Sequence, residues 1–337
     1  MRVRKFATTG LLLVGLLVAG CSQPAATQPT GSEAGASAPA AKPNTLTAIQ
    51  VDTVAADSAA AFWTDAPVLT VETKGAYEGA EAGPAVRVQA AYDAQSIALR
   101  FEWADAEASI MKHAWNWDGS TFTAGGDEDR VQLLWSIGNN ADFASKGCTG
   151  ACHNMDADQA KWWMGSESAD VRYDLWHWKA ARTNPVGQSD DQWISVLEDV
   201  ADMESSRHGD AKESGGYADN LNEAADGPAF MHGTDRKAAL LLSGEEVALD
   251  TSKLAAGDVV PGFVLAPAVG SRGDLTAKGE WQDGKWVVVL MRALDTGHDD
   301  DVVFTPPKAY PFGLGVTNNG GGTDHTVAPE VLTLERQ

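Results

Sequence analysis

Regular alternation of apolar and polar side chains limits the folds open to this chain more than any other feature. Residues 97–103 and 131–137 both place apolar side chains at every second position, which is the period of a half-buried β-strand. Residues 275–281 and 286–294 flank Asp283-Gly284, a dipeptide typical of a tight hairpin turn. Further strand-like runs lie at 310–316 and 331–334. Many short strands with turn signals predict a mainly β protein, folded as an antiparallel β-sandwich.

The charge of the chain is strongly acidic. The 337 residues carry a formal net charge of −22. Removing residues 1–20 takes away three basic residues and leaves 22 basic against 47 acidic ones, which makes −25. Such a protein is a poor ligand for nucleic acids or anionic membrane surfaces. The charge favours a basic protein partner instead, and we expect no nucleic acid partner.

The N-terminus resembles a lipoprotein signal peptide. Basic residues open the chain, and an apolar run over 11–20 is too short to span a membrane. It ends in Val18-Ala19-Gly20-Cys21, a pattern typical of a lipobox, in which Cys21 is lipidated and becomes the new N-terminus. Residues 21–44, rich in Ala, Pro, Ser, Thr and Gly, read as a flexible tether. We therefore expect an exported protein, lipid-anchored on the periplasmic or extracellular face of a membrane; an uncleaved anchor would tether it similarly.

One folded domain is expected over residues 45–337. Between about 138 and 237 the strand pattern breaks, so we interpret this range as a long loop and helix insertion on the sandwich. Residues 193–203 are the stretch within it that could form a helix. Functional sites lie more often on such segments than in a core.

The insertion contains Cys148-Thr149-Gly150-Ala151-Cys152-His153. Two cysteines followed at once by a histidine are typical of covalent c-type haem attachment, with the thiols bonded to the haem and His153 on the iron. The usual spacing has two residues between the cysteines and here there are three; Gly150 gives the longer loop conformational freedom. The alternatives are a Cys148–Cys152 disulfide in an exported protein, or a zinc site for which the chain lacks further cysteines.

Tryptophans gather near this motif. Trp163, Trp176 and Trp178 lie within about thirty residues of it. They are candidates for the wall of a haem pocket, and an equally plausible role is to cover the ends of the sheet.

Several stretches resemble the haem-binding subunit of ethylbenzene dehydrogenase and related molybdenum enzymes. They are Met164-Gly165, Asp174-Leu175-Trp176-His177-Trp178-Lys179-Ala180-Ala181-Arg182, Glu128-Asp129-Arg130-Val131 and Tyr310-Pro311-Phe312-Gly313. The similarity covers most of residues 46–337. The resemblance implies a β-sandwich, similar to family-9 carbohydrate-binding modules, that holds one haem and exchanges electrons with a partner. Members of the molybdoenzyme type hold haem b non-covalently through a methionine and a lysine, so haem b is the alternative to a covalent haem c.

The resemblance also suggests ligands for the second side of the iron. Met164 matches the position of the family's methionine, and a thioether ligand raises the reduction potential. His325 lies roughly where the family has its lysine. His177, between two tryptophans, is the third candidate. With His153 opposite, we rank Met164 first, then His325, then His177.

The sequence therefore predicts a lipid-anchored monohaem c-type cytochrome that transfers electrons and has no catalytic residues of its own. One alternative is an electron-transfer subunit of a molybdenum dehydrogenase or reductase complex. Another is a haem-free sandwich that binds carbohydrate or another ligand and contains a Cys148–Cys152 disulfide.

Overall fold

The computed structural model describes residues 42–75, 81–138, 140–147, 164–199, 202, 205–304, 308–320 and 325–336. Five residues that carry predictions lie outside these ranges: Cys21, Cys148, Cys152, His153 and Trp163. Within the described part of the chain, no helix is long and apolar enough to cross a membrane.

The described residues are mostly strands. The first group is β1 (Thr45–Gln50), β2 (Leu69–Val71), β3 (Lys74–Gly75), β4 (Val86–Tyr92), β5 (Ser96–Ala104), β6 (Ala114–Trp117), β7 (Phe122–Gly125), β8 (Glu128–Ile137), β9 (Arg172–Lys179), β10 (Asp190–Ile194) and β11 (Arg207–Gly209). The second is β12 (Ser214–Asp219), β13 (Phe230–His232), β14 (Glu246–Ala248), β15 (Val259–Val260), β16 (Phe263–Val269), β17 (Thr276–Gln282), β18 (Lys285–Ala293), β19 (Ala309–Gly320), β20 (His325–Val327) and β21 (Leu332–Arg336). The helices are α1 (Ala141–Lys146) and the short 3-10 turns η1 (Ala61–Thr64), η3 (Asn184–Val186), η4 (Thr251–Lys253) and η5 (Ser271–Gly273).

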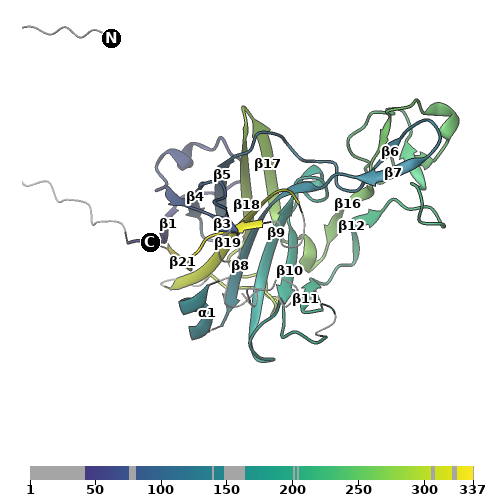
Figure 1. Ribbon diagram of the computed structural model, residues 1–337. Coiled ribbons are helices and arrows are strands. Elements are labelled where there is room, and N and C mark those ends of the chain that lie inside the picture. Colours follow the sequence, from purple (N-terminus) through teal and green to yellow (C-terminus); the bar gives the residue numbers. More distant parts are fainter. Residues whose placement is uncertain are drawn as a thin grey trace, which may run out of the picture. The chain divides into compact units, whose positions relative to one another are not determined.

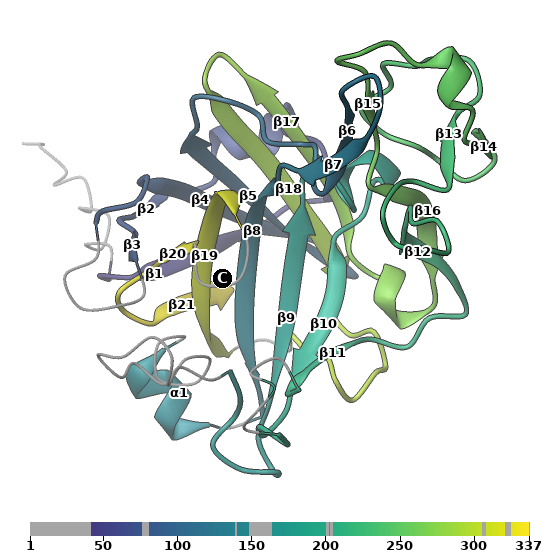
Figure 2. The ribbon, with the colours of Figure 1, turned by 45° about the vertical axis from the view of Figure 1, so that its right-hand side comes forward.

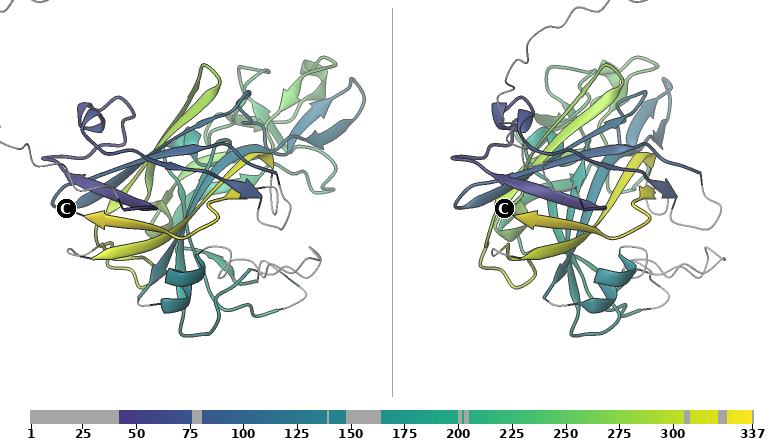
Figure 3. Two further views of the ribbon diagram at one scale, coloured as in Figure 1. Left: turned by 60° about the vertical axis from the view of Figure 1, so that its left-hand side comes forward. Right: turned by 90° about the vertical axis from the view of Figure 1, so that its left-hand side faces the viewer.

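A single 14-stranded sheet forms the body of the domain. Eleven of its strands follow the order β11-β10-β9-β8-β19-β21-β1-β4-β5-β18-β17; of the other three, β2 pairs with β4, and β20 pairs with β19 and β3. Strand β1 pairs in parallel with β21 through Thr45–Ala48 and in parallel with β4 from Ala48 onward. Because β1 changes partner at Ala48, it joins the two halves of the sheet; Figure 3 shows the purple first strand and the yellow last strand side by side. The mainly β prediction is confirmed, with parallel pairs at β1 inside an otherwise antiparallel arrangement.

The core lies between the two halves of this curled sheet. Trp135, Trp176 and Trp178 on β8 and β9 are fully buried, and they face apolar residues of β4, β5 and β18. The Trp178 ring lies 5.1 Å from that of Trp286 on β18, in an edge-to-face arrangement that suits aromatic pairs. The predicted alternation explains this core, because every second residue of a strand points to the same face.

A smaller lobe projects from one end of the sandwich (Figure 1). It contains the three-stranded sheet β15-β6-β7 and the hairpin-like pair β13-β14. Trp115, Met231 and Val260 form its own small core. Strand β12 pairs with β16 between the lobe and the main sheet.

The structure divides the range 138–237 that the sequence assigns to one insertion. Strands β9 and β10 fall inside this range, yet both belong to the main sheet. Two separate segments therefore leave the sheet, one between β8 and β9 and one after β11. The helix expected over 193–203 is wrong for its described part, because residues 193–194 end β10 and residues 195–199 contain no helix.

Candidate functional site

The outer face of β8, β9 and β10 carries an apolar cluster that is separate from the core. Leu134, Leu175 and Ile194 contribute one side chain from each strand, and Phe143 of α1 and Tyr173 complete it. Met164 is partly buried and packs against this cluster. We call these five residues and Met164 the outer cluster. The outer cluster brings together α1, the outer face of β8 to β10 and the Met164 thioether on one side of the sheet.

A network of hydrogen bonds fixes α1 to this face. The Asn140 side chain caps the helix by accepting from the backbone N–H groups of Asp142 and Phe143, which satisfies donors that a helix start leaves unpaired. Asn140 also donates to the Tyr173 hydroxyl at 2.9 Å, and that hydroxyl donates to Glu167 at 2.6 Å. Tyr173 therefore ties the chain before the Cys148–His153 segment to the chain after it; Figure 2 shows α1 beside the ends of β8 and β9.

Both ends of the segment 148–163, which lies outside the described residues, are anchored at this face. Before it, Gly147 closes α1 with φ of 64°, and a Cβ there would lie 3.2 Å from the Val331 backbone nitrogen, so glycine is required. After it, the Met164 carbonyl accepts from the Ser206 hydroxyl at 2.7 Å, and Ser166 N–H donates to Ser195 at 2.8 Å. The chain carrying the cysteine motif thus leaves and returns beside the outer cluster.

His177 lies on the same outer face but has hydrogen-bond partners at both ring nitrogens. Nδ1 lies 3.1 Å from Gln192 Oε1, and Nε2 lies 3.4 Å from the Gln132 side-chain amide. Burial, with Lys179 and Arg130 nearby, holds the pKa of His177 well below its usual range. The ring is therefore neutral, and in this arrangement it donates to Gln192 and accepts from Gln132.

His325 lies farther away along the sheet. It is the first residue of β20 and pairs with Thr317 of β19, which pairs with Arg130 of β8, which pairs with Lys179 of β9. Three strand spacings of about 4.8 Å put it roughly 14 Å from β9. The structure thus places Met164 and His177 on one face of the sheet, with His177 four residues, about 13 Å, along β9 from Tyr173, and leaves His325 at a distance from the outer cluster.

Trp176 and Trp178 point the other way, into the sandwich core, where both are fully buried. Trp176 Nε1 donates to Asp174 at 3.2 Å, and Trp178 Nε1 donates to Asn184 at 3.3 Å. Both therefore pack the core.

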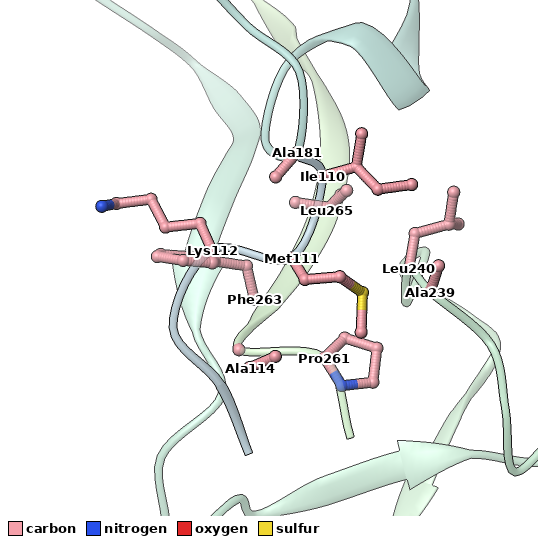
Figure 4. A pocket seen from close by; sticks show the side chains of 11 residues that line it. Ile110, Met111, Lys112, Ala114, Ala181, Ala239, Leu240, Pro261, Phe263 and Leu265 are labelled. Atoms are coloured by element: carbon pink, nitrogen blue, oxygen red, sulfur yellow. The ribbon is translucent and has the colours of Figure 1, made fainter. Parts of the chain in front are cut away.

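Two other side chains that could bind iron are engaged elsewhere. Lys179 donates to Asp190 and to the Tyr217 hydroxyl. Met111 lines a small pocket between the sandwich and the lobe, with Pro261 and Leu240 beside its sulfur (Figure 4). This pocket holds about 20 Å³, far below the roughly 300 Å³ of a typical ligand pocket, so it does not accommodate a haem.

Sequence reasoning missed a buried charge cluster inside the sandwich. Arg292 of β18 is fully buried and contacts Asp174 at 2.8 Å, Asp301 at 2.8 Å and Asp191 at 3.4 Å. An arginine inside the otherwise apolar strand 286–294 was the available signal, because a buried charge requires a partner.

Comparison with known proteins places the chain in a family. The family model described as ethylbenzene dehydrogenase matches residues 60–328. This chain belongs to that family. No curated protein matches the sequence.

Solved structures with similar folds include a candidate carbohydrate-binding protein from Bacteroides uniformis, with 11% identity, 87% of this chain and 99% of that chain covered, and a TM-score of 0.40. A family-9 carbohydrate-binding module from Caldicellulosiruptor kristjanssonii in complex with cellotriose has 7% identity over 87% and 93% of the two chains, with a TM-score of 0.35. The same module with glucose has 9% identity over 87% and 95%, with a TM-score of 0.34.

Proposed function

We propose that this member of the ethylbenzene dehydrogenase family is a lipid-anchored, extracytoplasmic electron-transfer protein with one covalently attached haem c. The observation that carries the proposal is the position of the two described residues that flank residues 148–163, the range that contains the cysteine motif. Gly147 and Met164 both lie beside the outer cluster. A haem bonded to Cys148 and Cys152 would then be held at one face of the sheet.

The described residues fit such a group. A haem needs apolar side chains against its ring and ligands for its iron. The outer cluster offers the apolar side chains, and Met164 adds a thioether eleven residues after His153. Cys148, Cys152 and His153 would hold the haem, which would supply one-electron redox chemistry.

Met164 is supported over the two histidines as the second ligand. His177 would have to give up its hydrogen bond with Gln132 to bind iron, and His325 lies three strands from β9. Met164 is already beside the segment that carries His153. The residues of the outer cluster would then position the Met164 sulfur and shield it from water.

The partner we propose is a basic redox protein, and the family favours association with a molybdenum enzyme complex. A mature charge of −25 accelerates encounter with a basic protein by long-range attraction. This attraction is screened once the Debye length falls to about 8 Å near 0.15 M salt. Electron transfer to a small basic cytochrome, used as the probe, should slow as salt is raised. A rate independent of salt would show that charge does not accelerate the encounter.

The test of the iron ligands compares two methionines. In protein produced with a c-type maturation system, the oxidised wild type should show a weak sulfur-to-iron band in the far red, and Met164→Leu should lose it. The control Met111→Leu alters a methionine in the distant pocket and should keep the band. A band that survives Met164→Leu contradicts this ligand; purified protein without any Soret band contradicts the function and favours a haem-free binding sandwich.

Anchoring has its own test, because residues 1–41 lie outside the described part of the chain. Cys21→Ser should abolish lipidation and release the protein from the detergent phase in a partitioning assay. Unchanged partitioning and unchanged mass would show that Cys21 carries no lipid.

A further inference from the structure

Acidic residues gather at one end of the sandwich. Asp210, Asp300 and Asp301 each offer a carboxylate oxygen, and the three oxygens lie within 4.8 Å of one another. Ca²⁺ binds oxygen ligands at 2.3–2.6 Å, so oxygens up to about 5 Å apart can share one ion. Asp301 is buried and Asp300 is partly buried, so a bound ion would be only partly hydrated.

A second observation points to a ligand at this position. Asp210 is 3% exposed, and its Oδ1 is buried with no hydrogen-bond partner in the described residues. Among the described residues, its other oxygen accepts from the Ser271 hydroxyl at 3.1 Å. A buried carboxylate oxygen without a partner is costly, and a cation between Asp210 and its two acidic neighbours would remove that cost.

Arg292, the buried cation beside this group, does not neutralise it alone. Arg292 contacts Asp301 but also Asp174 and Asp191, so one guanidinium serves three buried carboxylates. Burial and the nearby Asp300 and Asp301 raise the pKa of Asp210 to about 8. The buried end of the sandwich therefore carries an excess of carboxylates that either take up protons or bind a cation.

Access from solvent exists on one side. An open hollow of about 560 Å³ is lined by Ser271, His298 and Asp300, with Lys212 and Glu213 at its edge. The His298 side chain is 41% exposed and lies 3.1 Å from Asp274. A small cation can reach Asp300 from this hollow without opening the core.

We propose that Asp210, Asp300 and Asp301 form a binding site for a divalent cation of the Ca²⁺ type. Three carboxylates with no cysteine among them are a hard oxygen donor set, which favours Ca²⁺ over Zn²⁺. The Ser271 hydroxyl and water would complete the coordination. The ion stabilises the junction of β11, η5 and the loop after β18, which supply these residues. The site is independent of the haem.

The experiment uses the full chain after treatment with EDTA. Adding Ca²⁺ should raise the midpoint of thermal unfolding, with an apparent Kd on the order of 10⁻⁴ M, as in extracellular calcium modules. Tb³⁺ should bind with luminescence sensitised by tryptophan, and Ca²⁺ should displace it. Asp300→Asn should weaken Ca²⁺ binding about tenfold or more, because one charged ligand is lost.

The matched control is Asp299→Asn, which changes the neighbouring carboxylate; that side chain is 94% exposed and lies outside the acidic group. It should bind Ca²⁺ as the wild type does. Unfolding in EDTA shows whether each variant folds.

The proposal is overturned if about 10 mM Ca²⁺, a concentration well above the roughly millimolar range of weak protein sites, leaves the wild-type unfolding midpoint unchanged. It is also overturned if both variants bind Ca²⁺ equally. A third outcome also overturns it. If Asp210→Asn raises the stability at pH 8 by the same amount with and without Ca²⁺, the ion contributes nothing in the wild type, and protons alone occupy the site.

Discussion

On β9, Asp174, Trp176 and Trp178 point into the sandwich, whereas Tyr173, Leu175 and His177 point to the outer face. The inner residues pack against the opposite half of the sheet and against Arg292. Of the outer ones, Tyr173 and Leu175 pack in the cluster that contains Phe143 of α1 and Met164. Adjacent residues of one strand therefore have different tasks, because successive side chains of a strand point to opposite faces. The inner face supplies stability, and the outer face supplies the proposed haem site.

The largest expected effect comes from the inner face. Trp178→Ala should lower the free energy of unfolding by about 3–5 kcal/mol, because it leaves a cavity in the core. Trp281→Ala is the control: its side chain is 37% exposed, so the loss should be clearly smaller. Urea unfolding measures both. If Trp178 acts only in the core, the folded fraction of Trp178→Ala should still contain one haem per chain; a folded variant without haem would place Trp178 in the haem pocket.

The outer neighbour His177 should behave differently. His177→Ala removes the hydrogen bonds of the ring to the Gln132 and Gln192 amides, which should cost about 1–3 kcal/mol. The iron spectrum should stay low-spin, because His177 is not its ligand in our account. Conversion to high spin in His177→Ala, but not in Met164→Leu, would make His177 the ligand.

The pH dependence of stability should distinguish Asp210, at the end of the sandwich, from His177 on the outer face. The pKa of Asp210 is raised from 3.8 to about 8, so the folded protein keeps a proton that the unfolded chain releases. Stability should therefore fall as pH rises from about 4 to about 8 in EDTA, by at most about 1.4 kcal/mol per pH unit, and should level off at higher pH. His177, whose pKa is lowered, affects stability only below about pH 6.5. In Asp210→Asn the decline between about pH 6.5 and about pH 8 should become less steep, with buried Asp191, whose pKa is also raised, accounting for what is left; an equal decline in that variant would assign it to other groups.

The smallest effect concerns the tie between α1 and the chain that follows the motif. Tyr173→Phe removes the hydroxyl that links Asn140 to Glu167 and should cost about 0.5–1.5 kcal/mol. Hydrogen exchange should increase in α1 and leave the core strands unchanged. Unchanged exchange in α1 would show that Phe143 packing alone holds the helix.

Much of the sandwich can be predicted from sequence, because β5 and β8 alternate with a period of two and Asp283-Gly284 indicates the hairpin of β17 and β18. Strand β9 cannot be recognised in this way, because both of its faces are buried and its pattern shows no alternation. The parallel pairing of β1 depends on contacts with residues 333–336 at the other end of the chain. The Arg292 cluster joins positions 174, 191, 292 and 301, and no local pattern indicates which distant carboxylates meet. The family resemblance was confirmed, whereas the haem and its ligands remain predictions.

The central claim is that Cys148 and Cys152 bind haem covalently beside the outer face. Intact mass spectrometry of the purified chain, produced with a c-type maturation system, tests it most directly. The account predicts the mass of one added haem, which is lost in the Cys148→Ser, Cys152→Ser double variant. A wild-type mass equal to the bare chain, or lower by only the two hydrogens of a disulfide, would contradict it.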